Sequence, residues 1–185
     1  MNHRQISVYG DGSSGGDSKH GCGWGWLVID HTNDTVLGMG SGGLQTGTNN
    51  YGELKALIEG LKFVVEKELF FGNLVTLVSD SKYALGLASG EFNPVKNQEL
   101  AQEIRGLVIQ TRSRTMWIKG HSGDPYNTKC DALAKAGRDL VSPNKGTRKR
   151  QKRITERERK RAIKKTLKEA GKQPTPMVES PNGQT

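Results

Sequence analysis

The sequence predicts an α/β fold, a mixed sheet flanked by helices, followed by a basic C-terminal tail. Three strand-like segments come first, and two further strands then alternate with helical segments. This order is typical of a mixed sheet with helices packed on it. Charge separates the tail, because residues 1–141 carry 14 Lys plus Arg against 15 Asp plus Glu, whereas residues 142–185 carry 14 against 4. The net charges of −1 and +10 sum to the +9 of the 185-residue chain.

Strands are predicted where polar and apolar residues alternate or where apolar residues run together. Residues 5–9 alternate, as in a strand with one buried face, and residues 23–29 and 35–39 flank a segment of hairpin composition. Residues 74–78 are continuously apolar, which suits a strand buried on both faces. The last strand is expected at residues 115–119.

Helices are predicted where apolar residues recur every three or four positions. A helix over residues 51–67 is indicated by apolar residues at this spacing, namely Leu54, Leu57, Ile58, Leu61 and Val65. Further helices are expected over residues 82–88, 98–111 and 125–140, the last with Asp124 as its N-cap and Pro125 at its first position. A turn-forming segment at residues 142–146 separates the folded domain, residues 1–141, from the extension, residues 142–185.

Several protein classes are excluded by composition. No run approaches the ~18 apolar residues of a membrane span, and residues 1–5 lead into a strand without the apolar core of a signal peptide. Cys22 and Cys130 have no metal-ligand spacing and form no disulfide framework. We therefore expect a cytoplasmic monomer with no membrane contact. Gly38-Met-Gly-Ser-Gly-Gly43 matches a dinucleotide-binding pattern, but no helix opens on it, so we interpret it as a bent strand end.

Four acidic residues occupy positions from which they could converge. Asp11 follows the first strand, Glu53 opens the first long helix, Asp80 follows the buried strand and Asp131 lies two turns into the last helix. Converging carboxylates repel one another unless cations neutralise them. Oxygen ligands of this kind suit Mg²⁺ or Mn²⁺, and two such ions ~4 Å apart can clamp a phosphodiester during in-line attack. A helix cap or a surface charge is the simpler explanation of any one of these residues taken alone. Four acids at these positions are much harder to dismiss, although spacing does not prove convergence.

Five sequence blocks carry a family resemblance. They are Tyr9-Gly-Asp-Gly-Ser13, Thr48-Asn-Asn-Tyr-Gly-Glu-Leu54, Ser79-Asp-Ser-Lys-Tyr83, Trp117-Ile-Lys-Gly-His-Ser-Gly123 and Cys130-Asp-Ala-Leu-Ala134. In content and order they resemble type 1 ribonuclease H over about residues 5–140. The resemblance implies a five-stranded mixed sheet with its first three strands antiparallel. It also implies cutting of the RNA strand of an RNA–DNA hybrid, leaving 5′-phosphate and 3′-hydroxyl ends.

The same resemblance implies roles for individual residues. Asp11, Glu53, Asp80 and Asp131 match the metal-binding carboxylates for two Mg²⁺ ions, with Mn²⁺ as a substitute and Asp11 bridging both ions. His121 matches a histidine that assists proton transfer and product release, which suits a group that titrates near neutral pH.

Substrate contacts are expected from the loops beside these acids. Gly12 and Ser13 offer backbone groups near the site, Asn49 and Asn50 resemble residues that contact the hybrid, and Thr48 resembles part of a phosphate pocket for the DNA strand. Asn and Thr also favour the cap of a helix, and both roles can coexist. Distinguishing RNA from DNA requires recognition of the 2′-hydroxyl.

The sequence departs from some relatives between Asp80 and Asn97. That segment is short and lacks the basic, Trp-containing protrusion with which some family members grip the hybrid. We expect the tail to bind nucleic-acid backbones instead, through basic residues that include Arg148, Lys149, Arg150, Lys152 and Arg153. Residues 155–158 form a capping-box pattern, which predicts a helix there.

Two alternative functions fit the sequence less well than a hybrid-specific nuclease does. One alternative is another nuclease of the same fold, such as an exonuclease or a junction resolvase. The exonuclease is disfavoured because Asp11 is followed by Gly-Ser and not by the Asp-x-Glu pattern expected there. A catalytically silent nucleic-acid-binding module is disfavoured because all four acids and His121 are present.

Overall fold

The computed structural model describes residues 3–16, 21–142, 153, 155–158 and 160–161, and the chain divides into two units, residues 1–143 and 144–185. The elements of the first unit are β1 (Gln5–Ser14), β2 (Cys22–Asp30), β3 (Thr35–Leu44), α1 (Asn49–Glu66), β4 (Leu74–Ser79), α2 (Lys82–Ser89), α3 (Gln98–Thr111), β5 (Arg114–Trp117) and α4 (Pro125–Val141). Among the described helices, none is long and apolar enough to cross a membrane.

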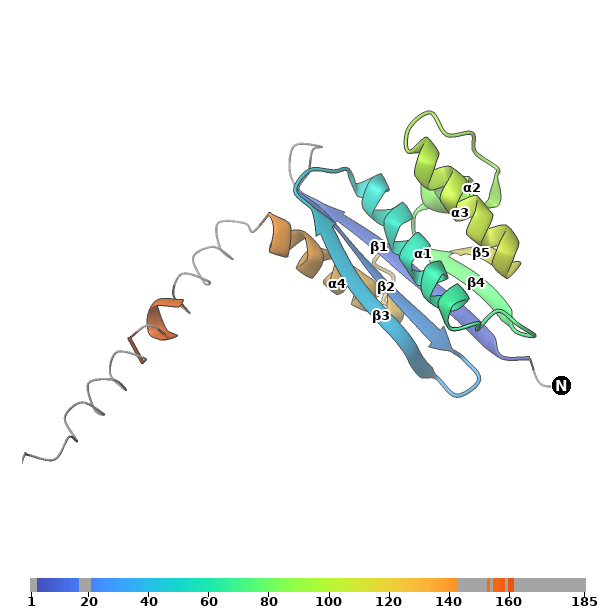
Figure 1. Ribbon diagram of the computed structural model, residues 1–185, viewed down its shortest axis with the longest axis horizontal. Coiled ribbons are helices and arrows are strands. Elements are labelled where there is room, and N and C mark those ends of the chain that lie inside the picture. Colours follow the sequence, from blue (N-terminus) through green and yellow to red (C-terminus); the bar gives the residue numbers. More distant parts are fainter. Residues whose placement is uncertain (1–2, 17–20, 143–152, 154, 159, 162–185) are drawn as a thin grey trace, which may run out of the picture. The chain divides into compact units, whose positions relative to one another are not determined.

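The strands form one five-stranded mixed sheet in the order β3-β2-β1-β4-β5 (Figure 1). β1, β2 and β3 are antiparallel neighbours, whereas β4 pairs parallel with β1 and β5 pairs parallel with β4. This confirms the predicted α/β class and the antiparallel arrangement of the first three strands. The parallel pair β1–β4 brings the carboxyl ends of two central strands to the same edge of the sheet.

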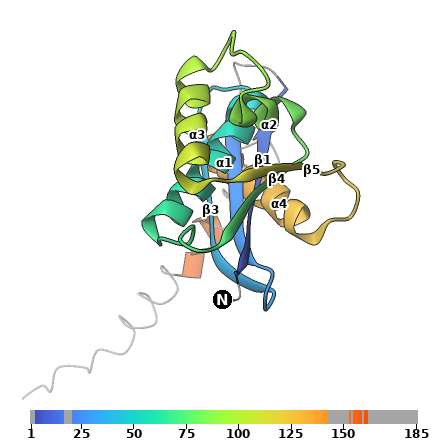
Figure 2. The ribbon, with the colours of Figure 1, turned by 90° about the vertical axis from the view of Figure 1, so that its right-hand side faces the viewer.

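Helices cover both faces of the sheet. Figure 2 shows α1 and α3 on one side and α4 on the other. The larger core cluster lies between the sheet and the α1 and α3 side, and it includes the fully buried Ile6, Leu57 and Leu77. A smaller cluster, with Tyr9, Leu27, Ile29, Val78 and Cys130, lies on the α4 side. The central strands therefore lie between two packed cores.

Two strands, β1 and β3, are each five residues longer than predicted. β1 continues to Ser14 because its pairing with β2 continues to that residue, so Asp11 lies within the strand and not after it. β3 likewise runs through the glycine-rich segment to Leu44, where a bent strand end was expected. A Cβ on Gly40 or Gly42 would lie within 2.8 Å of an indole ring carbon of Trp26 or Trp24, respectively. These glycines therefore make room for cross-strand tryptophans, and no helix opens on them.

The described residues of the second unit, 153, 155–158 and 160–161, are helical, in agreement with the predicted helix. Their side chains are exposed, and Glu156 pairs with Lys160 one turn later. Arg148, Lys149, Arg150 and Lys152 lie outside the described residues.

Candidate active site

Asp11 and Asp80 lie side by side because of the register of two parallel strands. The last aligned pair of β1 and β4 is Tyr9 with Val78, and each aspartate stands two residues further along its own strand direction. Neighbouring strands are ~4.8 Å apart, so side chains at equivalent positions are close neighbours. The predicted convergence of these two acids at the sheet edge is therefore what the register produces.

Glu53 joins them from α1. One ligand oxygen from each of Asp11, Glu53 and Asp80 lies within 4.8 Å of the other two. The helix comes this close because β1 carries Gly12, where a Cβ would lie 2.5 Å from the backbone nitrogen of Glu53. Gly12 thus permits a close approach of α1, which places the third carboxylate.

Two hydrogen bonds hold the Glu53 carboxylate in place. Asn49 Nδ2 donates to Glu53 Oε1 over 2.7 Å, and the Ser81 hydroxyl donates to Glu53 Oε2. Ser81 is also the N-cap of α2, since its hydroxyl accepts a hydrogen bond from the backbone nitrogen of Ala84. Glu53 is only 9% exposed, so its orientation is set by the protein and not by solvent.

Burial and neighbouring acids disfavour the ionisation of Asp11 and Glu53. Burial, followed by repulsion from Asp80, raises the pKa of Asp11 from 3.8 to about 7, against the opposing hydrogen bond from the Gly12 backbone N–H. Burial also raises the pKa of Glu53, with a contribution from Asp80. Such a cluster can hold a cation, because a bound cation would neutralise the repulsion. Hard oxygen donors at these positions fit Mg²⁺ or Mn²⁺.

Asp131 and His121 border Asp11 from the α4 side. All three line a cavity of about 60 Å³, together with Lys119, Ser122, Gly123, Asp124, Asn127 and Thr128. Asp131 lies near enough to Asp11 to raise its pKa, yet its own carboxylate is paired with Lys135 at 2.6 Å. In the described part of the chain, the compact cluster contains three of the four predicted acids, with Asp131 beside it.

His121 stands on the loop between β5 and α4. The residue is exposed and has a φ of 54°, a left-handed conformation that is uncommon for a residue other than glycine. The same loop passes over Asp80 at Gly120, where a Cβ would lie 2.6 Å from Asp80 Oδ2. Glycine at position 120 therefore lets the histidine loop cross the carboxylate closely.

Asn127 is a site residue that sequence reasoning missed. Its Nδ2 donates to Asp80 Oδ2 over 3.4 Å, and the residue is only 6% exposed. Its Oδ1 is buried and has no hydrogen-bond partner within the described structure. The available signal was its spacing, because Asn127 precedes Asp131 by four residues and thus lies on the same face of α4.

The residues predicted to touch substrate have varied surroundings. Thr48 caps α1 by accepting a hydrogen bond from the Tyr51 backbone nitrogen at 3.2 Å, and Asn50 is exposed in the first turn. Asn49 donates its side-chain hydrogen bond to Glu53. Ser13 is buried, and its hydroxyl accepts a hydrogen bond from Arg138 at 2.9 Å.

Comparison with known proteins agrees with this geometry. The family model for RNase H matches residues 3–139. Ribonuclease H of Treponema denticola is 32% identical over 152 residues, which cover 70% of this chain and 94% of that protein. The N-terminal RNase H domain of a Mycobacterium tuberculosis protein, solved as a fusion with maltose-binding protein, superposes with a TM-score of 0.64 at 25% identity and covers 75% of this chain and 96% of that chain.

A third similar protein is LC11-RNase H1, from a compost metagenome, which has been solved in complex with an RNA/DNA hybrid. In that complex it superposes with a TM-score of 0.60 at 21% identity, covers 74% of this chain and 98% of its own, and shares the fold. Taken together, the carboxylate cluster, the extent of the family match and the identity to curated relatives show that this chain belongs to the ribonuclease H family of endonucleases.

Proposed function

We propose that the protein cuts the RNA strand of RNA–DNA hybrids by a two-metal-ion mechanism and leaves 5′-phosphate and 3′-hydroxyl ends. The observation that carries the proposal is the cluster of Asp11, Glu53 and Asp80, whose carboxylate oxygens lie within 4.8 Å of one another. Binding of a hybrid by the similar LC11-RNase H1 supports this choice of substrate.

The carboxylates would hold Mg²⁺, for which Mn²⁺ is a chemically reasonable substitute. Asp11, Glu53, Asp80 and Asp131 would hold the two ions. When bound, the ions supply an activated water molecule and stabilise the leaving 3′-oxygen. The raised pKa of Asp11 supports this assignment, since a neighbouring positive charge would offset the repulsion from the other acids.

The protein's own side chains keep this arrangement ready for substrate. Asn49 and Ser81 hold the Glu53 carboxylate by hydrogen bonds, so it is already oriented before substrate arrives. His121, exposed on its loop and lining the cavity shared with Asp11, can exchange a proton with solvent and with the reacting oxygens.

Selection of RNA over DNA would come from residues at the start of α1 and the end of β1. We assign contacts with the hybrid to Asn49 and Asn50, a DNA-phosphate contact to Thr48, and contacts near the 2′-hydroxyl to the backbone of Gly12 and Ser13. The N-terminus of α1 supports the phosphate contact, because the first backbone N–H groups of a helix attract anions.

The second unit would increase affinity without sequence preference. Residues 142–185 carry 14 basic residues, among which Arg153, Arg157 and Arg161 are exposed at four-residue spacing on a helix. Residues at this spacing share one helical face, which suits binding along a phosphate backbone. We therefore assign catalysis to residues 1–141 and nucleic-acid retention to the extension.

The test is cleavage of a labelled RNA–DNA hybrid in Mg²⁺, beside matched double-stranded RNA, double-stranded DNA and single-stranded RNA. Internal cuts confined to the RNA strand of the hybrid are expected, with end chemistry checked by a 5′-phosphate-dependent exonuclease. The matched control is Asp80→Asn, which keeps the shape of the side chain and removes its charge. Cleavage of double-stranded RNA at an equal rate, or full activity of Asp80→Asn, would overturn the proposal.

A further inference from the structure

The geometry points to a second substrate contact, formed by Lys82 and Trp117, that binds the backbone of the RNA strand next to the bond that is cut. The inference rests on the proposed function, because it assigns a neighbouring part of the same substrate. Neither residue was predicted from the sequence as a site residue.

Trp117 is anchored directly to the site. It is the last residue of the edge strand β5, and its Nε1 donates a hydrogen bond to the backbone oxygen of Asp80 over 2.9 Å. The side chain is nevertheless 48% exposed. A fixed aromatic ring with half of its surface open to solvent is a platform on which a base or a sugar can pack.

Lys82 adds a positive charge to this platform. Its Nζ lies 4.7 Å from the centre of the Trp117 ring, and the residue is exposed. Within the described structure, this ring contact is the sole interaction of the Lys82 ammonium. A lysine at the first position of a helix is opposed by the helix dipole, so helix stability does not explain its place in α2. An unpaired ammonium beside a nuclease site suits a phosphate.

A groove of about 360 Å³ extends from this pair. Phe92 forms part of its wall, and the ring packs where α2 has Gly86, at which a Cβ would lie 2.4 Å from the Phe92 ring. Glu91 is the one acidic residue that lines the groove, and it forms no ion pair with Lys82 within the described structure. Its charge would repel a nucleic-acid strand that followed the whole groove. The favourable contact is therefore at the end formed by Lys82 and Trp117.

Proximity to Asp80 indicates which strand of the hybrid Lys82 and Trp117 contact. Trp117 bonds the Asp80 backbone and Lys82 follows Asp80 by two residues, so a phosphate at this pair neighbours the one held at the carboxylates. That phosphate belongs to the strand being cut. Residues 81–97 contain only two basic residues, Lys82 and Lys96, so Lys82 is the basic residue of this segment that adjoins the site.

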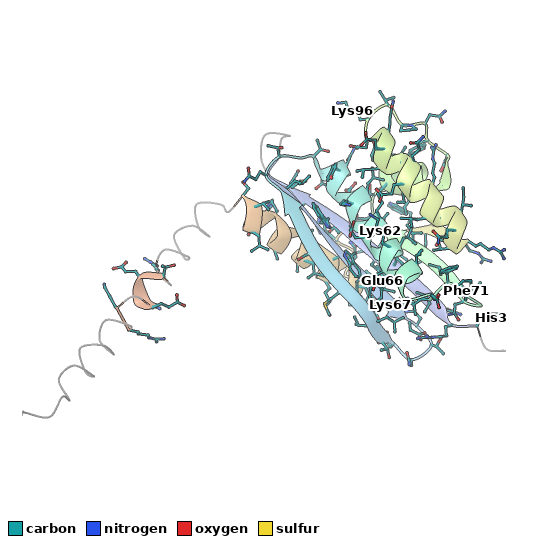
Figure 3. The ribbon with its side chains drawn as sticks, in the orientation of Figure 1. His3, Lys62, Glu66, Lys67, Phe71 and Lys96 are labelled. Carbon is teal, nitrogen blue, oxygen red and sulfur yellow. The ribbon has the colours of Figure 1, made fainter. Side chains whose placement is uncertain are left out.

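Lys82→Met tests the contact, because Met keeps a similar length and helix propensity but loses the charge. We expect KM for the hybrid to rise on the order of 3–10-fold with kcat changed less than about twofold. The slope of log binding constant against log salt concentration should become shallower by about one unit, which corresponds to the loss of one phosphate contact. The control is Lys96→Met, an equal charge change on the loop between α2 and α3 (Figure 3). An equal effect of the two variants would overturn the inference.

Two further measurements sharpen the result. In the first, one phosphate of the RNA strand at a time is replaced by a neutral methylphosphonate. At one position the replacement should weaken binding to the wild type but not to Lys82→Met. Equal losses of affinity in both proteins at every position would refute the contact. Trp117→Phe should keep a near-normal KM and Trp117→Leu should raise it, whereas equal values for both would exclude a ring platform.

The outcomes separate the two proposals. A wild-type protein that cuts the hybrid while Lys82→Met behaves like Lys96→Met refutes the contact alone. A wild-type protein that does not cut the hybrid refutes the proposed function, and with it the assignment of this pair to the RNA strand.

Discussion

Replacing Asp11 with Asn should stabilise the metal-free protein. Burial raises the pKa of Asp11, and repulsion from Asp80, Asp131 and Glu53 raises it further. Asn has the same shape, and its Oδ1 can keep the hydrogen bond that the Gly12 backbone N–H now donates to Asp11 over 2.7 Å. The variant therefore removes repulsion and the cost of burying a charge while preserving the local contacts.

The size and pH dependence of this effect follow from the pKa. Because the pKa of Asp11 rises from 3.8 to about 7 on folding, the folded state holds a proton between these values that the unfolded chain has released. The free energy of unfolding of the wild type therefore falls as pH rises through this window. About three pKa units correspond to ~4 kcal/mol as a ceiling, and partial exposure of Asp11 reduces our expectation to about 1–2 kcal/mol above pH 7.

Urea denaturation in EDTA, followed by tryptophan fluorescence at pH 4 and pH 8, measures this difference. The free energy of unfolding of Asp11→Asn should exceed that of the wild type at pH 8 and match it near pH 4. Added Mg²⁺ should stabilise the wild type more than the variant. The control is Glu66→Gln, at an exposed carboxylate paired with Lys67 near the end of α1 (Figure 3). Equal unfolding free energies for Asp11→Asn and the wild type at pH 8, or a gain that is the same at both pH values, would refute the reasoning.

Three further changes have defined outcomes. Asp80→Asn should reduce cleavage by about 10²–10³-fold or more while hybrid binding in EDTA persists; near-normal activity would remove Asp80 from the metal site. His121→Ala should slow turnover by about 10²-fold and leave measurable activity in a single-turnover assay, and an unchanged rate would make it a bystander. Deletion of residues 142–185 should flatten the log–log salt dependence of hybrid binding by ~0.9 for each phosphate that the extension neutralises, yet preserve cleavage at low salt; an unchanged slope would exclude the extension from binding.

Local patterns in the sequence predicted the fold class and placed each acidic residue on its element, whereas the resemblance to ribonuclease H implied that these residues share one site. Period-two and helical patterns depend on near neighbours in the chain, so they predicted all nine elements of the first unit, with errors mainly at the ends of β1 and β3. The positions of Asp11 and Asp80 relative to their strands were also local information. Once β1 and β4 are parallel neighbours, strand geometry brings these two residues together.

How closely the remaining groups approach depends on tertiary packing. Glu53 joins the cluster because α1 packs against the bare backbone at Gly12, and the histidine loop crosses Asp80 because position 120 is also glycine. Asn127, with its bond to Asp80, and Trp117, anchored to the Asp80 backbone, were not recognised in advance. Such contacts join residues far apart in the chain, and their distances depend on how helices and strands pack, which no local pattern in the sequence specifies.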